Sequence, residues 1–359
     1  MPETKGFELR RNDYSLSEDQ EAVRGLFAEF FAAECPTTRV RAAEPLGYDE
    51  RLWQGLAKMG AVSMGLPESA GGDGATMVEL ALVAEEYGRV IAPVPLIEAV
   101  TAARTLARCG GGSAAQWIAG NVDGLPLTVL ALHPVVSGAR QLVPAGAIAR
   151  AVVALDGDDL VLVTSAEPPP FVPNQGTAPL AWWDPSAGDR EVLATGARAR
   201  ELFATALGEW KVLTAAALVG LADEVKRLGA EFTKTRTTMG VPVGSLQGVS
   251  HPLADVEIEV SGARNLTRKA AWFAEHEPRA RPELLPMSYA NAVRCATQAA
   301  RVGLHVQGGF GFTLESDVTL YFRRVKGWSA LAGDPSNELL AIGDVLATSD
   351  AAASWSPSA

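Results

Sequence analysis

The feature that most constrains the fold of this chain is a long helical repeat of apolar side chains in its second half. The repeat predicts one helix from Arg198 to about Gly240, where Gly240 and Pro242 end it. Its members are Phe203, Leu207, Trp210, Ala217, Leu221, Leu228 and Phe232. Further helices are expected at about 249–276, 284–306 and 338–347. Consecutive long helices pack against one another, so the second half is predicted to form a helical bundle.

The N-terminal part also indicates helices. Ser17 and Gln20 form a capping-box signature before an amphipathic stretch. The segment from Met77 to Arg89 is expected to turn Leu80, Val83 and similar residues toward a core and its glutamates toward water. Residues 1–120 are therefore predicted to form a helical domain.

Between about 125 and 197 the pattern changes to short runs rich in Val and Leu. Runs at 127–132, 151–155 and 160–163 predict strands, and Asp156-Gly-Asp-Asp159 predicts a hairpin turn between two of them. We therefore expect a mainly α protein with a small, reduced β domain at 121–197. The bundle follows at 198–348, and the small, polar residues 349–359 are expected to form a mobile tail.

Composition excludes several classes of function. The formal net charge of −11 argues against nucleic acid as a partner, because phosphate binding draws on a basic surface. No signal peptide and no apolar run able to span a membrane is recognised, so the cytoplasm is the expected compartment. No metal site is expected, because the cysteines and histidines are widely separated. They are Cys35, Cys109, Cys295, His133, His251, His276 and His305.

Two segments of the predicted bundle carry the most specific motifs. The first, 236–247, reads RTTMGVPVGSLQ, and the second, 305–311, reads HVQGGFG. Together they resemble two cofactor-contacting motifs of acyl-CoA dehydrogenases, an arginine before Phe-Gly with a distal glutamine and, later, Gln-x-x-Gly-Gly-x-Gly. Shorter matches at 66–74, 85–89, 242–255 and 321–324 extend the resemblance over nearly the whole chain. It implies the fold of that family: a helical domain, a β domain and a C-terminal four-helix bundle.

The resemblance also implies a reaction, but some of the residues that carry out this reaction in the family are missing here. Members of the family use a glutamate before a glycine to remove the α-proton of an acyl-CoA thioester, and a flavin accepts the β-hydride. Ala332 occupies the place of that glutamate, and alanine cannot take a proton. Asp334 is considered as a stand-in. The flavin-facing loop of the β domain is replaced by Leu132-His-Pro-Val-Val-Ser-Gly138.

Some relatives place the glutamate early in the long bundle helix. An ungapped count back from Arg236 puts Trp210 at that place, with Glu209 beside it. One residue along a helix is a rotation of about 100°, so Glu209 points away from where its neighbour points. Glu209 is therefore either a weak candidate base or a glutamate on a solvated helix face.

The retained motifs belong to the half of the family's FAD site that a neighbouring subunit supplies. By resemblance, Arg236 binds the diphosphate, and Gly308 and Gly309 allow close approach of the backbone. Gln247 and His305 are candidate polar contacts, and Met239 replaces the usual phenylalanine. The alternative interpretation needs no cofactor: Arg236 caps a helix, the glycines form a turn and His305 is a core histidine.

The resemblance is closest to the non-catalytic subunits of heterotetrameric acyl-CoA dehydrogenases (α2β2 in subunit notation) of bacterial steroid and cholesterol side-chain degradation. It implies an FAD shared with a paralogous catalytic partner that supplies the glutamate. It also implies a bulky acyl-CoA substrate and an electron-transfer flavoprotein that reoxidises the flavin. Two alternatives stay open: a self-sufficient homomeric dehydrogenase that uses Glu209, and a flavin-free structural homologue.

Overall fold

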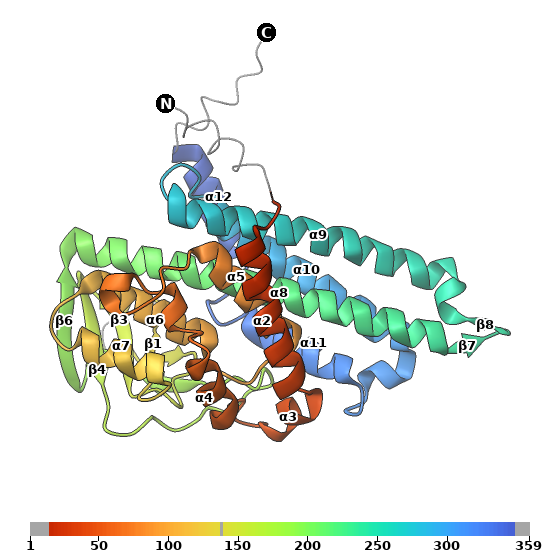
Figure 1. Ribbon diagram of the computed structural model, residues 1–359, viewed down its shortest axis with the longest axis horizontal. Coiled ribbons are helices and arrows are strands. Elements are labelled where there is room, and N and C mark those ends of the chain that lie inside the picture. The colour runs from red at the N-terminus through yellow and green to blue at the C-terminus, as the bar shows by residue number, and fades with distance from the viewer. Residues whose placement is uncertain (1–13, 137–138, 349–359) are drawn as a thin grey trace, which may run out of the picture.

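The computed structural model describes residues 14–136 and 139–348. A helical N-terminal domain and a small β domain lie around one half of the long helix α8 (Gly196–Thr235), and the other half extends into the bundle (Figure 1). The protein is mainly α-helical with few strands, as the sequence predicts. The expected mobile tail at 349–359 lies outside the described residues.

The N-terminal domain begins with a helix whose start the sequence predicts correctly. The Ser17 hydroxyl accepts from the Gln20 backbone N–H, and the Gln20 side chain accepts from the Ser17 N–H. A second capping box, made by Thr76 and Glu79, starts the helix that packs on α8. The helices are α2 (Glu18–Glu34), α3 (Thr37–Ala42), α4 (Glu50–Lys58), α5 (Met77–Arg89), α6 (Leu96–Cys109) and α7 (Ala114–Asp123).

The β domain contains a four-stranded sheet in the order β1-β3-β4-β6. β1 pairs with β3 in parallel and the other pairs are antiparallel. The predicted hairpin is confirmed, since Asp156 pairs with Asp159 across a turn in which Gly157 has a φ of +59°. A second sheet pairs β2 with β5. The strands are β1 (Thr128–Leu130), β2 (Gln141–Val143), β3 (Ala151–Asp156), β4 (Asp159–Thr164), β5 (Ala181–Trp183) and β6 (Asp189–Thr195).

The bundle is built around α8, which contacts α5, α9 and α10 along its length. The remaining helices are α9 (Gln247–His276), α10 (Leu284–Gln307), α11 (Asp317–Trp328) and α12 (Asn337–Thr348). By length and composition α8 could cross a membrane, but 78% of its most apolar stretch is buried inside the protein. Its apolar composition is therefore that of a core helix.

The predicted end of the long helix is wrong by several residues. α8 ends at Thr235, and a hairpin of β7 (Thr237–Thr238) and β8 (Val241–Pro242) follows. Met239 and Gly240 form its turn with φ values of +49° and +79°. The turn reverses the chain sharply, so these residues cannot continue a right-handed helix.

The sequence predicts that the glutamates of α5 face water, but two of them do not. Glu85 and Glu86 are buried, with 5% and 6% of their surface exposed. Glu85 accepts from Arg264 of α9 at 2.8 Å, and Glu86 accepts from Arg89 at 2.9 Å. Arg89 also pairs with Asp223 of α8 at 2.9 Å. The Glu85–Arg264 and Arg89–Asp223 pairs join the N-terminal domain to the bundle. Together with the Glu86–Arg89 pair within α5, they explain why buried acidic residues are tolerated there.

Candidate functional site

An open groove lies at the end of the bundle that carries the β7–β8 hairpin. Its volume is about 710 Å³. The chain builds it from the C-terminal end of α8, the hairpin, the start of α9 and the turn η4 (Gly308–Phe312) that follows α10. Its lining brings together Arg236 and, from a distant part of the sequence, His305, Gly308 and Gly309. We refer to it as the tip groove.

Two of the predicted site residues do not line the tip groove. Met239 stands at the turn of the hairpin with 94% of its surface exposed. Gln247 is the first residue of α9 and is also exposed, but it is not among the lining residues. Both lie on segments that border the groove, so only a molecule that extends beyond it reaches them.

Arg236 offers the groove a cation that the described part of the chain leaves without an ion-pair partner. Its backbone is fixed at the end of α8, where its N–H donates to the Phe232 carbonyl at 3.0 Å and its carbonyl accepts from the Val243 N–H at 2.8 Å. Its side chain is exposed and, within residues 14–136 and 139–348, has no recorded hydrogen bond or ion pair. The backbone of Arg236 therefore caps the helix, and the guanidinium is available to an anionic ligand.

Glycine occupies the three glycine positions of the Gly-Gly-Phe-Gly turn for different structural reasons. Gly308 has a φ of +60°, a region that favours glycine. A Cβ on Gly311 would lie 2.5 Å from the Leu304 carbonyl oxygen, so packing requires glycine there. Gly309 has an ordinary φ, and a Cβ there meets nothing within 4 Å. Fold alone does not explain Gly309, whose backbone is open to the groove.

His305 is exposed, and the interpretation as a satisfied core histidine is wrong. It lies on the last turn of α10 and lines the groove. The groove also has an aromatic lining that was not predicted from the sequence: Phe232 of α8 and Phe310 stack with ring centroids 6.0 Å apart and planes at 5°. Phe310 keeps 46% of its surface exposed. The aromatic residue within the glycine turn is the sequence signal that could have indicated this aromatic lining.

Glu209 lies far from this groove, in a buried ion-pair cluster between α6 and α8. It is 4% exposed and pairs with Arg104 at 3.0 Å and with Arg108. Arg104 also pairs with Glu275 of α9 at 2.9 Å. Burial raises the pKa of Glu209, but the attraction and hydrogen bonds of Arg104 and Arg108 outweigh it and hold the pKa below its ordinary value. The interpretation as a solvated-face glutamate is wrong, and both arginines oppose proton uptake.

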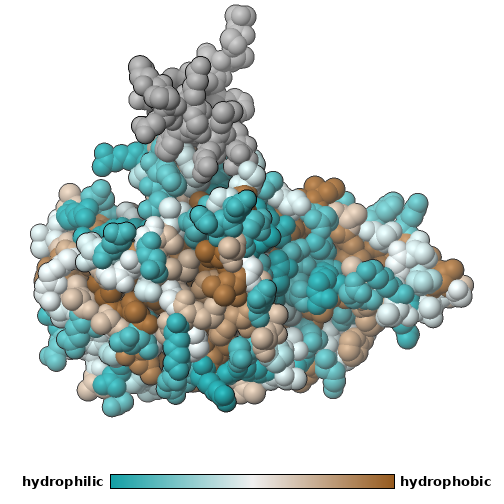
Figure 2. All heavy atoms as spheres, in the orientation of Figure 1, coloured by the Kyte–Doolittle hydropathy of each residue, from teal (hydrophilic) through white to brown (hydrophobic). Residues whose placement is uncertain are grey.

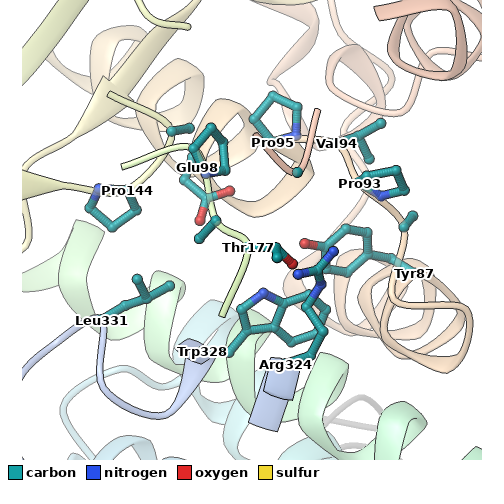
Figure 3. A pocket seen from close by; sticks show the side chains of 15 residues that line it. Tyr87, Pro93, Val94, Pro95, Glu98, Pro144, Thr177, Arg324, Trp328 and Leu331 are labelled. Carbon is teal, nitrogen blue, oxygen red and sulfur yellow. The ribbon is translucent and has the colours of Figure 1, made fainter. Parts of the chain in front are cut away.

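A second, much smaller cavity lies where the N-terminal domain, the β domain and α11 meet (Figure 3). We refer to it as the junction cavity. Its volume is about 30 Å³, and Glu98, Arg324, Trp328 and Leu331 are among its lining residues. A cavity needs roughly 10 to 15 Å³ to hold one water molecule, so it has room for one or two small ligands and none for an acyl chain.

Within the part of the chain that the structure describes, no group of three or more His, Cys, Asp or Glu side chains is placed to hold a metal ion.

Comparison with known proteins decides the family. Residues 17–117 match the model of the acyl-CoA dehydrogenase N-terminal domain, and residues 200–346 match that of the acyl-CoA dehydrogenase C-terminal domain. The chain belongs to the acyl-CoA dehydrogenase family. It is thus a member of a family of flavoprotein oxidoreductases.

Individual relatives of this acyl-CoA dehydrogenase cover nearly its whole length. The acyl-CoA dehydrogenase IpdE2 of Mycolicibacterium smegmatis is 29% identical over 90% of this chain and 97% of its own. The solved ChsE4–ChsE5 complex from Mycobacterium tuberculosis contains a chain with 27% identity and a TM-score of 0.81, covering 94% of this chain and 99% of that one. A variant of the Tcur3481–Tcur3483 steroid ACAD gives 26% identity and a TM-score of 0.82, covering 94% and 100%.

The sequence predicts Ala332 at the place of the usual base, and alanine has no group that takes up a proton. Ala332 lies in the loop after α11, partly buried, next to Gly333 with a φ of +95°. Asp334 is exposed and accepts from the Ser336 backbone N–H at 2.9 Å, which makes it a turn residue. Hydrogen bonds from the backbone and hydroxyl of Ser336 hold the pKa of Asp334 below its ordinary value. Neither residue is suited to remove a proton near neutral pH.

Proposed function

We propose that this chain is the non-catalytic subunit of a heteromeric, FAD-dependent acyl-CoA dehydrogenase. Its tip groove holds the adenosine and diphosphate half of an FAD, and a paralogous partner provides the catalytic glutamate and the surroundings of the flavin ring. The observation that carries the proposal is the unpaired guanidinium of Arg236 beside the open backbone of Gly308 and Gly309. A cation next to an exposed glycine backbone, which a ligand can approach closely, suits a diphosphate.

The residues of the groove fit the chemistry of that half of the cofactor. Arg236 presents a planar set of donors to phosphate oxygens, and the exposed His305 adds a further polar group. Phe310 stacks on Phe232 and offers an aromatic edge and a partly exposed face to a heterocycle. When bound, the FAD supplies the acceptor for the hydride that leaves the substrate. This chain contributes binding and orientation only.

The size of the junction cavity also supports the assignment of this chain as a non-catalytic subunit. It is lined by residues of all three domains, yet it has no room for an acyl chain. Leu331, which lines it, precedes Ala332 at the place of the usual base. The alternative of a homomeric enzyme that uses Glu209 is disfavoured by the two arginines on its carboxylate.

A partner subunit is supported by the apolar surface around the tip groove. Met239, Phe312 and Leu314 expose 94%, 74% and 69% of their surface. Figure 2 shows some hydrophobic surface, interspersed with hydrophilic residues, at the end of the bundle. Apolar residues gathered at one end of a molecule mark a protein contact. A partner that covers this end would also close the groove over its ligand.

The names of the similar structures suggest the substrate class. One is called a steroid ACAD, and both are two-component assemblies. We therefore propose a heterotetramer with two copies of each subunit, acting in the cytoplasm on a bulky, steroid-containing acyl-CoA thioester. An electron-transfer flavoprotein reoxidises the flavin. If the purified complex oxidised short linear thioesters and ignored steroid ones, the substrate assignment would be wrong.

The visible absorbance spectrum tests the shared site. The chain purified alone should be colourless, and its complex with a paralogous acyl-CoA dehydrogenase should show the bands of oxidised flavin. Arg236→Ala should remove most FAD from the complex. Lys234→Ala is the matched control, because Lys234 is an exposed cation on the same helix that pairs with Glu231 at 2.7 Å. Flavin bands in the isolated chain would contradict the proposal.

A further inference from the structure

The junction cavity contains polar groups that the proposed function does not use. Arg324 enters it from α11, Thr177 from the loop before β5, and Glu98 from α6 (Figure 3). Tyr87 of α5 also lines it and stacks on Trp328 with ring centroids 5.3 Å apart. The cavity is thus a small polar space inside an otherwise apolar junction.

Arg324 brings a positive charge into this space without a matching negative one. Its side chain is buried, with 3% of the residue exposed. One nitrogen, Nη1, donates to the Gly176 carbonyl at 2.5 Å, and the other, Nη2, is buried and has no hydrogen-bond partner among residues 14–136 and 139–348. Among the described residues no ion pair of Arg324 is recorded, and nearby Glu44 pairs with Arg323 at 3.2 Å. Burial lowers the pKa of Arg324 to about 10, as expected for an uncompensated cation.

Thr177 places a second unsatisfied donor in the same cavity. The residue is 3% exposed, and its Oγ1 is buried without a partner. The backbone around it is held by close glycine contacts. A Cβ on Gly47 would lie 1.8 Å from the Thr177 carbonyl oxygen, and one on Gly327 would lie 2.6 Å from the Gly176 Cα. The loop packs tightly between the N-terminal domain and α11. The Thr177 hydroxyl and the Arg324 guanidinium therefore cannot easily move to reach water.

Glu98 does not supply the missing negative charge directly. It lines the cavity, but no ion pair joins it to Arg324 among the residues described. Burial raises the pKa of Glu98 to about 7. The carboxyl is therefore largely protonated below neutral pH and adds no full charge there.

An uncompensated buried cation beside a free hydroxyl donor is costly, and a small anion removes both deficits. We propose that the junction cavity binds one monovalent anion of the size of chloride or bromide between the Arg324 guanidinium and the Thr177 hydroxyl. Both groups donate to it, and its charge balances that of Arg324. The volume of about 30 Å³ accommodates a monatomic ion. This site is independent of the proposed cofactor groove.

Thermal unfolding of the full-length chain tests the site in solution. Sodium chloride and sodium bromide are compared with sodium gluconate at equal ionic strength, because gluconate is too large for the cavity. At an anion concentration ten times the Kd, the halides should raise Tm by about 2 °C over gluconate. Thr177→Val and Arg324→Met should lose this difference. Arg323→Met is the matched control and should keep it, because Arg323 pairs with Glu44 instead.

Bromide also allows direct location of the ion, which keeps the proposal testable if a cavity variant fails to fold. Crystals of the wild-type chain grown or soaked in bromide should show an anomalous peak within hydrogen-bond distance of Arg324 Nη2. A water molecule without anomalous signal at that position would overturn the proposal. So would a halide effect on Tm of equal size in wild type and Thr177→Val.

Discussion

The tip groove and the junction cavity differ in how the chain treats its polar groups. At the tip, Arg236 and His305 are exposed and have no recorded partner among residues 14–136 and 139–348, and the groove volume is about 710 Å³. At the junction, Arg324 and Glu98 face a space of about 30 Å³. Exposed unpaired groups cost little free energy, whereas buried ones cost several kcal/mol unless compensated. The difference is consistent with the two proposals: an open groove for a large ligand at the tip, and a small site for one ion at the junction.

The largest effect is expected where buried charges hold the core. Glu209→Gln leaves Arg104 and Arg108 without their shared carboxylate. We expect a loss of about 3 to 5 kcal/mol in the free energy of unfolding, measured in urea. Arg236→Ala at the tip should change it by less than about 0.5 kcal/mol. Unchanged stability in Glu209→Gln together with lost activity of the complex would restore Glu209 as a candidate base.

Substitutions of two glycines in the same turn distinguish an effect on folding from an effect on ligand binding at the tip groove. Gly311→Ala places a Cβ 2.5 Å from the Leu304 carbonyl oxygen, so it should cost about 2 kcal/mol of stability. Gly309→Ala meets no atom within 4 Å and should leave the urea midpoint nearly unchanged. It should nevertheless lower the FAD content of the complex about tenfold, because the added methyl faces the groove. A fully flavinated Gly309→Ala complex would count against the cofactor contact.

The pH dependence of stability sharpens the contrast at the junction. The pKa of Glu98 is raised from 4.5 to about 7, so ionisation disfavours the folded state. The protonated Glu98 carboxyl contributes its full share to the folding stability below about pH 4.5, and this share is lost as the pH rises through 7. Glu98→Gln should therefore be more stable than wild type at pH 8, by about 1 to 2 kcal/mol, with the difference vanishing toward pH 4.5. A constant difference across this range would show that Glu98 does not titrate there.

The smallest effect concerns the aromatic pair at the tip. Phe310→Ala removes the stack on Phe232 and should cost about 1 kcal/mol, whereas Phe312→Ala should cost almost nothing because that ring is 74% exposed. Chemical unfolding measures both. Equal costs would mean that the stack contributes nothing beyond burial.

Elements with strong local signals were predictable from the sequence. Asp156 and Asp159 face each other across the hairpin turn, and the capping box at Ser17 starts α2 as expected. The predictions for Glu85 and Glu209 failed because their partners are distant in sequence. Glu85 is neutralised by Arg264, and Glu209 by Arg104 and Arg108, which local periodicity cannot reveal.

The sequence by itself determined the family, the helical bundle and the small β domain, and it predicts the loss of the usual base at Ala332. These follow from residue identity and spacing, which act locally along the chain. Only the tertiary structure decided which charges are buried and which are available. It brought Arg236 and Gly309 to one open groove and buried Arg324 at a small cavity. The physical reason is that desolvation depends on everything packed around a group, and most of those neighbours lie far away in the sequence.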